Sequence, residues 1–383
     1  MKILRIKASG LPLFNEELNI KFYSTQRVSD DDRTSLIEIS KKPALYLNPS
    51  TVFIGINASG KTSVLKVLEF SLRMLNSEPI NHISVKSILG NCEKAQFEQY
   101  FLDVNNNICL LKTIISSNRT INGEINYSIV YEEFYEKSLD SVSGRKYLCD
   151  FDSIEPKEIR NNTEMYLSDD VSIVIGHNKA AADKMSIQSL LSYTNINVLP
   201  YIDNISPEII SFLDPTVEKI WFENESLKRI VHLKFYGKDE IILNSSLELE
   251  KYLSSGTIKG IVVFTLARAI IQSGGYLIID EIENHFNNEI VATLIRFFRE
   301  NRVNVNSGSI IYSTHHAQLL DEYDRNDSIY ITRNNNGITA RNLSESLSRN
   351  DIKKSDVYRS DLLQGTAPNY ETYAKLRKSF ESK

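Results

Sequence analysis

The chain has 383 residues, 42% of them apolar and 24% charged, an ordinary globular composition with room for one large domain or two to three smaller ones. Its formal charge of -5 argues against a protein that coats nucleic acid nonspecifically, although a local basic face stays open. The N-terminus MKILRIKASG alternates like a strand rather than a signal peptide, and we see no apolar run near the ~18 residues that span a bilayer, so we expect a cytoplasmic protein.

The three cysteines, Cys92, Cys109 and Cys149, lie far apart and have no C-x-x-C spacing. This arrangement suggests neither a zinc site nor a disulfide scaffold, and we expect buried free thiols.

In the first lobe, 1–136, the sequence pattern predicts antiparallel strands around a phosphate-binding loop. LRIKAS and LNIKFYS flank a turn at Gly10 and Pro12, and three further strand-like runs form a meander: FEQYFLDV, NICLLKTIIS and NYSIVYEEFYE.

Between the first two strands and the meander lies the segment TVFIGINASGKTSVLKVLEF, residues 51–70. Its pattern predicts a strand, a loop and an amphipathic helix. The loop matches G-x-x-x-x-G-K-[ST], whose backbone N–H groups and following helix bind phosphate. Lys61 would reach the β- and γ-phosphates, and the Thr62 hydroxyl would bind Mg²⁺. A plain Gly-rich turn is the alternative. The predicted nucleotide-binding residues are Gly55, Asn57, Ala58, Ser59, Gly60, Lys61, Thr62 and Ser63.

The pattern weakens over 137–222, where NKAAADKMSIQSLLSYT favours helix, so we expect an inserted, mostly helical subdomain of unassigned function. A second lobe, 223–345, begins with a hairpin, RIVHLKFYG and DEIILNS. YLSSGTIKGIVVFTLARAII follows, and its Ser254, Ser255 and Gly256 form an anion-binding helix N-terminus or an ordinary N-cap.

GGYLIIDEIENHF then reads as a buried strand that ends in two carboxylates. Asp280 fits an acid that holds Mg²⁺, and Glu281 fits the base that orients the attacking water. An acidic strand-to-helix turn is the alternative.

The next strand, SIIYSTHHAQLLD, ends in two histidines. We expect His315, rather than His316, to contact the γ-phosphate, and we expect Glu281, His315 and Lys61 to be catalytic. YDRNDSIYITRNNNGITARN predicts one more hairpin, and the tail 346–383 docks on its own core or on a partner.

This order of motifs resembles an ABC-type ATPase head, and LSSGT is similar to the LSGGQ signature at Leu253, Ser254 and Gly256. The motifs look most like the soluble branch with SMC, RecF and OLD-family proteins, especially stand-alone ATPases of bacterial antiphage defence. The resemblance implies an α/β head, with a mixed central sheet and an antiparallel β subdomain.

In such heads the signature of one subunit closes on the ATP held by the P-loop of another. The resemblance therefore implies ATP and Mg²⁺, a homo-oligomer of at least two chains, and an ATP-hydrolysing switch that controls a separate effector, a nuclease or toxin. We expect no TOPRIM-type nuclease domain after His316, because the stretch that follows is shorter than a typical extra domain. No sensor glutamine is assigned: Gln96, Gln99 and Gln188 all remain candidates.

Other functions stay open. A RecF-like DNA-maintenance ATPase would need a basic groove, whereas an SMC form would need heptads that are absent between Lys112 and Tyr252. A transporter subunit would need a membrane partner, which the LSSGT signature disfavours. A nucleotide-gated scaffold without turnover is also compatible with these motifs.

Overall fold

The computed structural model describes residues 1–120, 122–160, 167–182, 184–191, 205–225, 228–284, 286–360, 362–363, 365–366 and 370–381. Its centre is a six-stranded sheet that is parallel apart from its last strand. The strand order is β10 (Ile187–Ser189), β14 (Tyr276–Ile279), β15 (Ser309–Thr314), β5 (Ser50–Ile54), β16 (Ile329–Asn334) and β17 (Ile338–Asn342).

An antiparallel sheet forms a second layer, as the alternating N-terminal strands predict. The meander predicted after the P-loop forms its middle. Its order is β2 (Leu18–Lys21), β1 (Lys2–Ser9), β6 (Ala95–Leu102), β7 (Asn107–Arg119), β8 (Ile125–Ser138) and β9 (Glu158–Ile159). A two-stranded ladder, β3 (Ile37–Lys41) and β4 (Ala44–Leu47), packs its side chains on this sheet.

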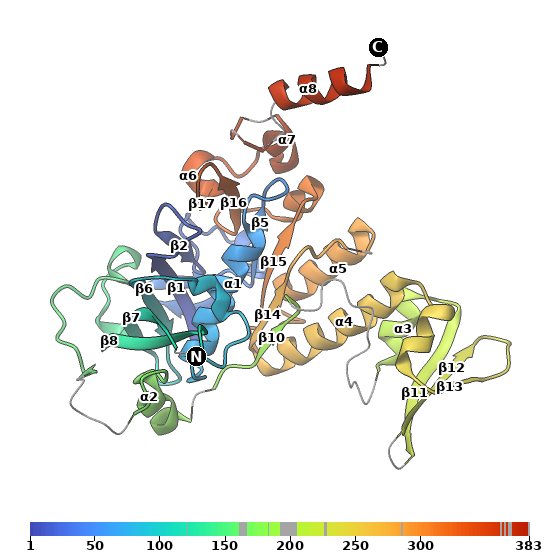
Figure 1. Ribbon diagram of the computed structural model, residues 1–383, viewed down its shortest axis with the longest axis horizontal. Coiled ribbons are helices and arrows are strands. Elements are labelled where there is room, and N and C mark those ends of the chain that lie inside the picture. Colours follow the sequence, from blue (N-terminus) through green and yellow to red (C-terminus); the bar gives the residue numbers. More distant parts are fainter. Residues whose placement is uncertain are drawn as a thin grey trace.

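Helix α1 (Lys61–Leu75) lies between these two sheets (Figure 1). Helices α4 (Ser255–Ser273) and α5 (Asn288–Arg299) cover the other face of the central sheet. Strand β5 shows how the layers divide, since Phe53 packs with α1 whereas Val52 and Ile54 pack with α4 and α5. A strand buried on both faces needs the continuous apolar run that the sequence provides.

By length and composition alone α4 could cross a membrane, but 61% of its most apolar window is buried inside the protein. It packs against the central sheet as a core helix does. The apolar character of α4 therefore follows from its position in the second core.

A three-stranded sheet stands apart at one end of the molecule, beyond α4 (Figure 1). It consists of β11 (Val217–Glu225), β12 (Lys228–Phe235) and β13 (Ile241–Leu243), with α3 (Pro207–Leu213) packed between it and α4. The hairpin predicted here is confirmed by β12 and β13.

The described residues of 137–222 are spread over three sheets, because β9 extends the antiparallel sheet, β10 the central sheet and β11 the three-stranded sheet. They include two short helices, α2 (Val174–Ala181) and α3, so the expectation of a mostly helical subdomain is wrong for this part of the chain. Of the run predicted to be helical, Asn178 to Ala181 lie in α2 as predicted, whereas Ile187 to Ser189 form β10, because pairing with β14 outweighs local helical preference there. Residues 192–194 of that run lie outside the described residues.

The predicted C-terminal hairpin is confirmed by β16 and β17. Three helices follow it: α6 (Leu343–Ser346), α7 (Lys354–Arg359) and α8 (Tyr370–Phe380). Ser355 in α7 is fully buried and donates to Asp321, which fastens this part of the tail to the protein's own core. Helix α8 extends away from it (Figure 1).

Candidate nucleotide-binding site

The P-loop connects β5 to α1 through backbone conformations that require small residues. Gly60 has φ +95°, and a Cβ there would lie 2.6 Å from the side chain of Ile338. A Cβ on Gly55 would lie 2.3 Å from Ser59 Oγ. Ala58 also has a positive φ, of 62°. The motif's glycines are therefore needed at these two positions for steric reasons.

Lys61 is almost fully buried at the start of α1. Its Nζ donates to the carbonyl oxygens of Gly55 at 2.9 Å and Ile56 at 3.2 Å, and lies 3.2 Å from His315 Nδ1. Burial lowers the pKa of Lys61, and the carboxylates of 280–283 offset this only in part. An ammonium held this way is poorly solvated and gains strongly from a nearby anion.

Thr62 and Asp280 meet at the edge of the sheet. The Thr62 hydroxyl donates to Asp280 Oδ2 at 2.6 Å, and Ser313 Oγ donates to the other carboxylate oxygen. A hydroxyl and a carboxylate are hard oxygen ligands, and Mg²⁺ takes few such ligands from protein when phosphates and water supply the rest. These two residues therefore fit Mg²⁺.

Glu281 follows Asp280 in a left-handed backbone conformation, with φ 46°. Its N–H donates to Ser313 Oγ at 2.8 Å, and its carboxylate accepts from Asn284 at 2.7 Å. The second oxygen lies 3.2 Å from His315 Nε2. Burial raises the pKa of Glu281, but the hydrogen bonds from Asn284 and His315 and the charge on Lys61 outweigh it, so the pKa lies below its ordinary value. Glu281 is thus ionised and held in one orientation.

The two histidines after β15 face different surroundings. His315 bridges Lys61 and Glu281, and a tautomer with its proton on Nε2 satisfies both contacts. Its backbone N–H donates to the buried carboxylate of Glu283. His316 instead places Nδ1 2.6 Å from Asn288 Oδ1 on α5. Of the two, only His315 lies at the P-loop.

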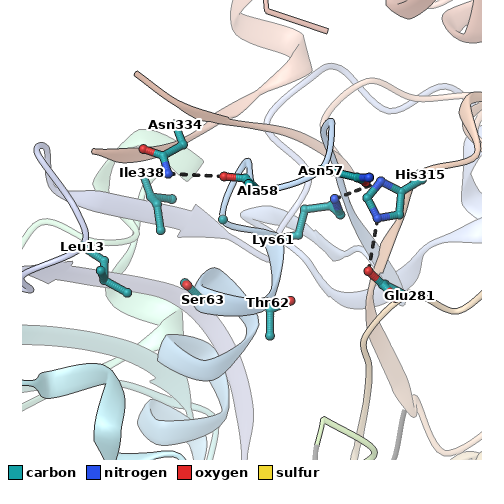
Figure 2. A pocket seen from close by; sticks show the side chains of 11 residues that line it. Leu13, Asn57, Ala58, Lys61, Thr62, Ser63, Glu281, His315, Asn334 and Ile338 are labelled. Atoms are coloured by element: carbon teal, nitrogen blue, oxygen red, sulfur yellow. Dashed lines mark hydrogen bonds and ion pairs between the residues drawn. The ribbon is translucent and has the colours of Figure 1, made fainter. Parts of the chain in front are cut away.

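Figure 2 shows Lys61, Thr62, Glu281 and His315 among the side chains that line a cavity of about 440 Å³. The sequence analysis did not predict three residues that line this cavity: Leu13, Asn334 and Ile338. Asn334 donates to the carbonyl oxygen of Ala58 at 3.3 Å, which ties β16 to the P-loop. The sequence offered no signal for them, because they come from the loop after β1 and from the β16–β17 hairpin, which only the fold brings to the P-loop.

A second cavity, of about 450 Å³, shares Asn57 and His315 with the first and is also lined by residues of the C-terminal segment. Tyr358 and Thr366 form its tail wall, and the Thr366 hydroxyl donates to the carbonyl oxygen of Tyr358 at 2.6 Å. The tail therefore packs beside the phosphate-binding loop.

The signature-like residues Ser254, Ser255 and Gly256 line neither of these cavities as far as the described residues define them. Ser254 is the N-cap of α4, and its Oγ accepts from the N–H of Thr257 at 3.0 Å. The N-cap interpretation of this segment is thus confirmed, and the structure does not bring these residues to the P-loop of the same chain.

None of the three candidate sensor glutamines lines the P-loop cavity in the described part of the chain. Gln99 is buried and donates to the carbonyl oxygen of Ser71 at 2.9 Å, which is a packing role. Gln96 is exposed on β6, and Gln188 pairs with β14 on β10.

Sequence reasoning also missed Lys259 and Glu283. Lys259 is buried on α4, and neither its Nζ nor Glu283 Oε2 makes a hydrogen bond within the described structure. Burial lowers the pKa of Lys259, and the charge of Glu283 is the main influence that opposes it. Because Glu283 also holds the backbone of His315, this pair links α4 to the site.

Comparison with known proteins is limited. No protein-family model matches the chain. The ORC1-type DNA replication protein 3 of Sulfurisphaera tokodaii is similar to it, with 23% identity over 184 residues. The match covers 48% of this chain and 42% of that protein, so this chain spans less than half of its relative's length.

The fold is P-loop NTPase-like. It is mixed α/β with a mostly parallel sheet, in which β15 lies between the strands that carry the P-loop and Asp280. Because parallel strands end at one edge, the residues after β5, β14 and β15 converge there.

Proposed function

We propose that the protein binds and hydrolyses ATP with Mg²⁺ at the P-loop. The observation that carries this proposal is the contact chain from Lys61 through His315 to Glu281, beside the Thr62–Asp280 pair. A cation, an imidazole, a carboxylate and a metal-binding pair from three strand ends are what phosphoryl transfer to water requires.

In this mechanism Glu281 orients the attacking water and accepts its proton, for which an ionised carboxylate held by Asn284 is suited. Lys61 and His315 stabilise the negative charge on the transferred phosphoryl group. Thr62 and Asp280 would hold Mg²⁺, which supplies charge neutralisation when bound. The loop N–H groups from Gly55 to Ser63 would bind the phosphates.

We further propose that the chain is an ABC-type switch ATPase that assembles head to tail. Support comes from the separation of the two motifs in sequence and from the cavity lining, since Ser254 to Gly256 do not line the P-loop cavity of their own chain. A second copy would supply them across an ATP-held interface, and hydrolysis would release it.

The biological setting rests on the resemblance of the motifs alone. It favours a cytoplasmic antiphage defence system in which the switch controls a separately encoded nuclease or toxin, with no membrane partner. The proposal that the chain belongs with SMC- and OLD-like ATPases rests on the same resemblance.

A second candidate function is ATP-dependent DNA maintenance, which the similarity to a DNA replication protein favours. An equilibrium binding measurement with duplex DNA at several salt concentrations distinguishes the two functions. ATP-dependent affinity that falls steeply with salt would support DNA maintenance. DNA affinity that depends on neither ATP nor salt would favour the effector switch.

The deciding test of the ATPase proposal is Glu281→Gln, with Glu289→Gln on the exposed surface of α5 as the matched control. We expect Glu281→Gln to bind ATP, to release phosphate at least ~100-fold more slowly, and to accumulate as an ATP-dependent oligomer by light scattering. Glu289→Gln should behave as wild type.

Phosphate release that survives Glu281→Gln would remove this carboxylate as the base. A mass that ignores nucleotide while hydrolysis falls would leave the ATPase intact but contradict assembly through the nucleotide sites.

A further inference from the structure

A cluster of metal-ligating side chains lies in the antiparallel layer, remote in sequence from every nucleotide-site motif. Asp103 follows β6, Cys109 belongs to β7, and His177 belongs to α2. One ligand atom from each residue lies within 4.8 Å of the other two. We propose that these three residues form a zinc site that fastens α2 to the end of the β6–β7 hairpin.

The orientation of Asp103 suits a metal ligand. Its Oδ1 accepts from the backbone N–H groups of Asn105 and Asn107, both at 2.8 Å, which fixes the carboxylate in the turn. Oδ2, which also accepts from the Asn107 side chain at 3.3 Å, is directed toward His177. A ligand held by neighbouring hydrogen bonds loses little freedom when a metal binds.

His177 provides the observation that points to a ligand. Its side chain is only 9% exposed, and its Nε2 is buried without a hydrogen-bond partner in the described structure. The nearest carboxylate oxygen, Asp103 Oδ2, lies 3.6 Å away, too far for a hydrogen bond. Tetrahedral zinc with bonds of ~2.0–2.3 Å separates its ligand atoms by roughly 3.3–3.8 Å. The gap therefore has the length that a bridging ion requires.

The other ring nitrogen faces a different carboxylate. His177 Nδ1 lies 3.8 Å from Glu136 Oε2, and that oxygen accepts from Lys157 at 2.7 Å. A carboxylate beside Nδ1 favours the tautomer that leaves the Nε2 lone pair for a metal. The rings of Phe134 and Phe101 contact the imidazole and hold its plane.

Charge balance and ligand chemistry select zinc. With Cys109 as a thiolate, the two negative ligands Asp103 and Cys109 neutralise a divalent ion, while Lys157 neutralises Glu136. A thiolate, an imidazole and a carboxylate suit Zn²⁺ and disfavour Mg²⁺ and Ca²⁺, which prefer oxygen ligands. Three protein ligands leave a fourth position for water.

A protonated His177 between Asp103 and Glu136 would also balance the charges. It would, however, be expected to draw both carboxylates to hydrogen-bonding distance, and the separations are 3.6 and 3.8 Å. The cysteine spacing did not predict this site because its ligands come from a turn, a strand and a helix rather than from one local motif.

The test uses the full-length, tag-free protein, with zinc measured by mass spectrometry after dialysis against Zn²⁺ and excess Mg²⁺. We expect about one zinc per chain in wild type and in Cys92→Ser, a buried cysteine outside the cluster. Cys109→Ser and His177→Gln should each weaken zinc affinity at least ~10-fold in chelator competition. Zn²⁺ should raise the melting temperature of wild type and of Cys92→Ser more than that of either ligand variant.

A second measurement remains decisive if Cys109→Ser does not fold. Co²⁺ bound to wild type should give the charge-transfer absorption of a cobalt–thiolate bond, and His177→Gln should reduce it. Wild type that retains no zinc and shows no cobalt–thiolate band would overturn the proposal. So would equal zinc affinity in wild type, Cys109→Ser and His177→Gln.

Discussion

The two parts of the proposed nucleotide site differ in how far one chain completes them. At the P-loop, Lys61 contacts His315, His315 contacts Glu281, and Thr62 contacts Asp280 within the single chain. At the start of α4, Ser254 caps its own helix and does not line the P-loop cavity in the described part of the chain.

The P-loop site and the start of α4 therefore depend on different parts of the structure. The P-loop residues come from the ends of adjacent parallel strands, so the sheet alone assembles them. The start of α4 is capped within its own chain, and in the proposed head-to-tail assembly its further role would need a second copy. Its contribution should therefore be separable by mutation from that of the P-loop.

The largest effect is expected for Lys61→Ala. Removing the ammonium should weaken ATP binding and reduce phosphate release at least ~100-fold, because in the proposed mechanism this charge contacts the β- and γ-phosphates. Titration with a fluorescent ATP analogue and a phosphate-release assay measure the two effects. Lys66→Ala, on the same helix but away from the cavity, is the control. An equal loss in both variants would indicate damage to α1 instead.

Ser255→Arg should affect assembly rather than binding. We expect unchanged ATP affinity, with hydrolysis reduced at least ~10-fold because a bulky cation blocks the partner's nucleotide. Mixing Ser255→Arg with Lys61→Ala in equal amounts should restore about a quarter of wild-type hydrolysis, since half the dimers would then hold one intact composite site. No recovery on mixing would argue that each chain works alone.

Ser254→Ala should reduce stability through the lost cap. The Ser254 hydroxyl accepts the N–H of Thr257, so removing it should lower the free energy of unfolding by about 1 kcal/mol in a urea titration. Ser273→Ala, at the exposed last residue of α4, should change it much less. If both variants unfold alike, the cap contributes nothing measurable.

The smallest effect concerns Glu281 and pH. Its folded pKa lies below the ordinary 4.5, so the ionised group stabilises the fold above pH 4.5, and this contribution is lost as the pH falls through the folded pKa. The side chain is 39% exposed, so wild type should exceed Glu281→Gln by less than ~1 kcal/mol near neutral pH. Urea unfolding at several pH values would contradict this if the difference grew toward acid.

The sequence predicted the elements that carry strong local patterns. The P-loop strand and helix, the meander, the two hairpins and the strands ending at Asp280 and Thr314 all stand as expected. Burial on both faces of a sheet requires a continuous apolar run, and a phosphate-binding turn requires glycine at fixed places. The residues that meet each of these requirements lie within a few positions of one another in the sequence, so a local pattern reveals them.

The segment 137–222 did not follow its local preference. Strand β10 forms in a run with helical composition because its backbone pairs with β14, far along the chain. No local pattern records such pairing.

Local sequence patterns therefore predict the phosphate-binding loop, the buried strands and the polar residues at the ends of those strands. His315, which the order of the strands favoured over His316, lies beside Glu281. Only the tertiary structure shows that Leu13, Asn334 and Ile338 line the cavity at the P-loop. It also decided that Asp103, Cys109 and His177 meet. Turn and strand preferences act between residues that are neighbours in the sequence. These contacts instead arise when sheet packing brings together segments that are far apart in the sequence.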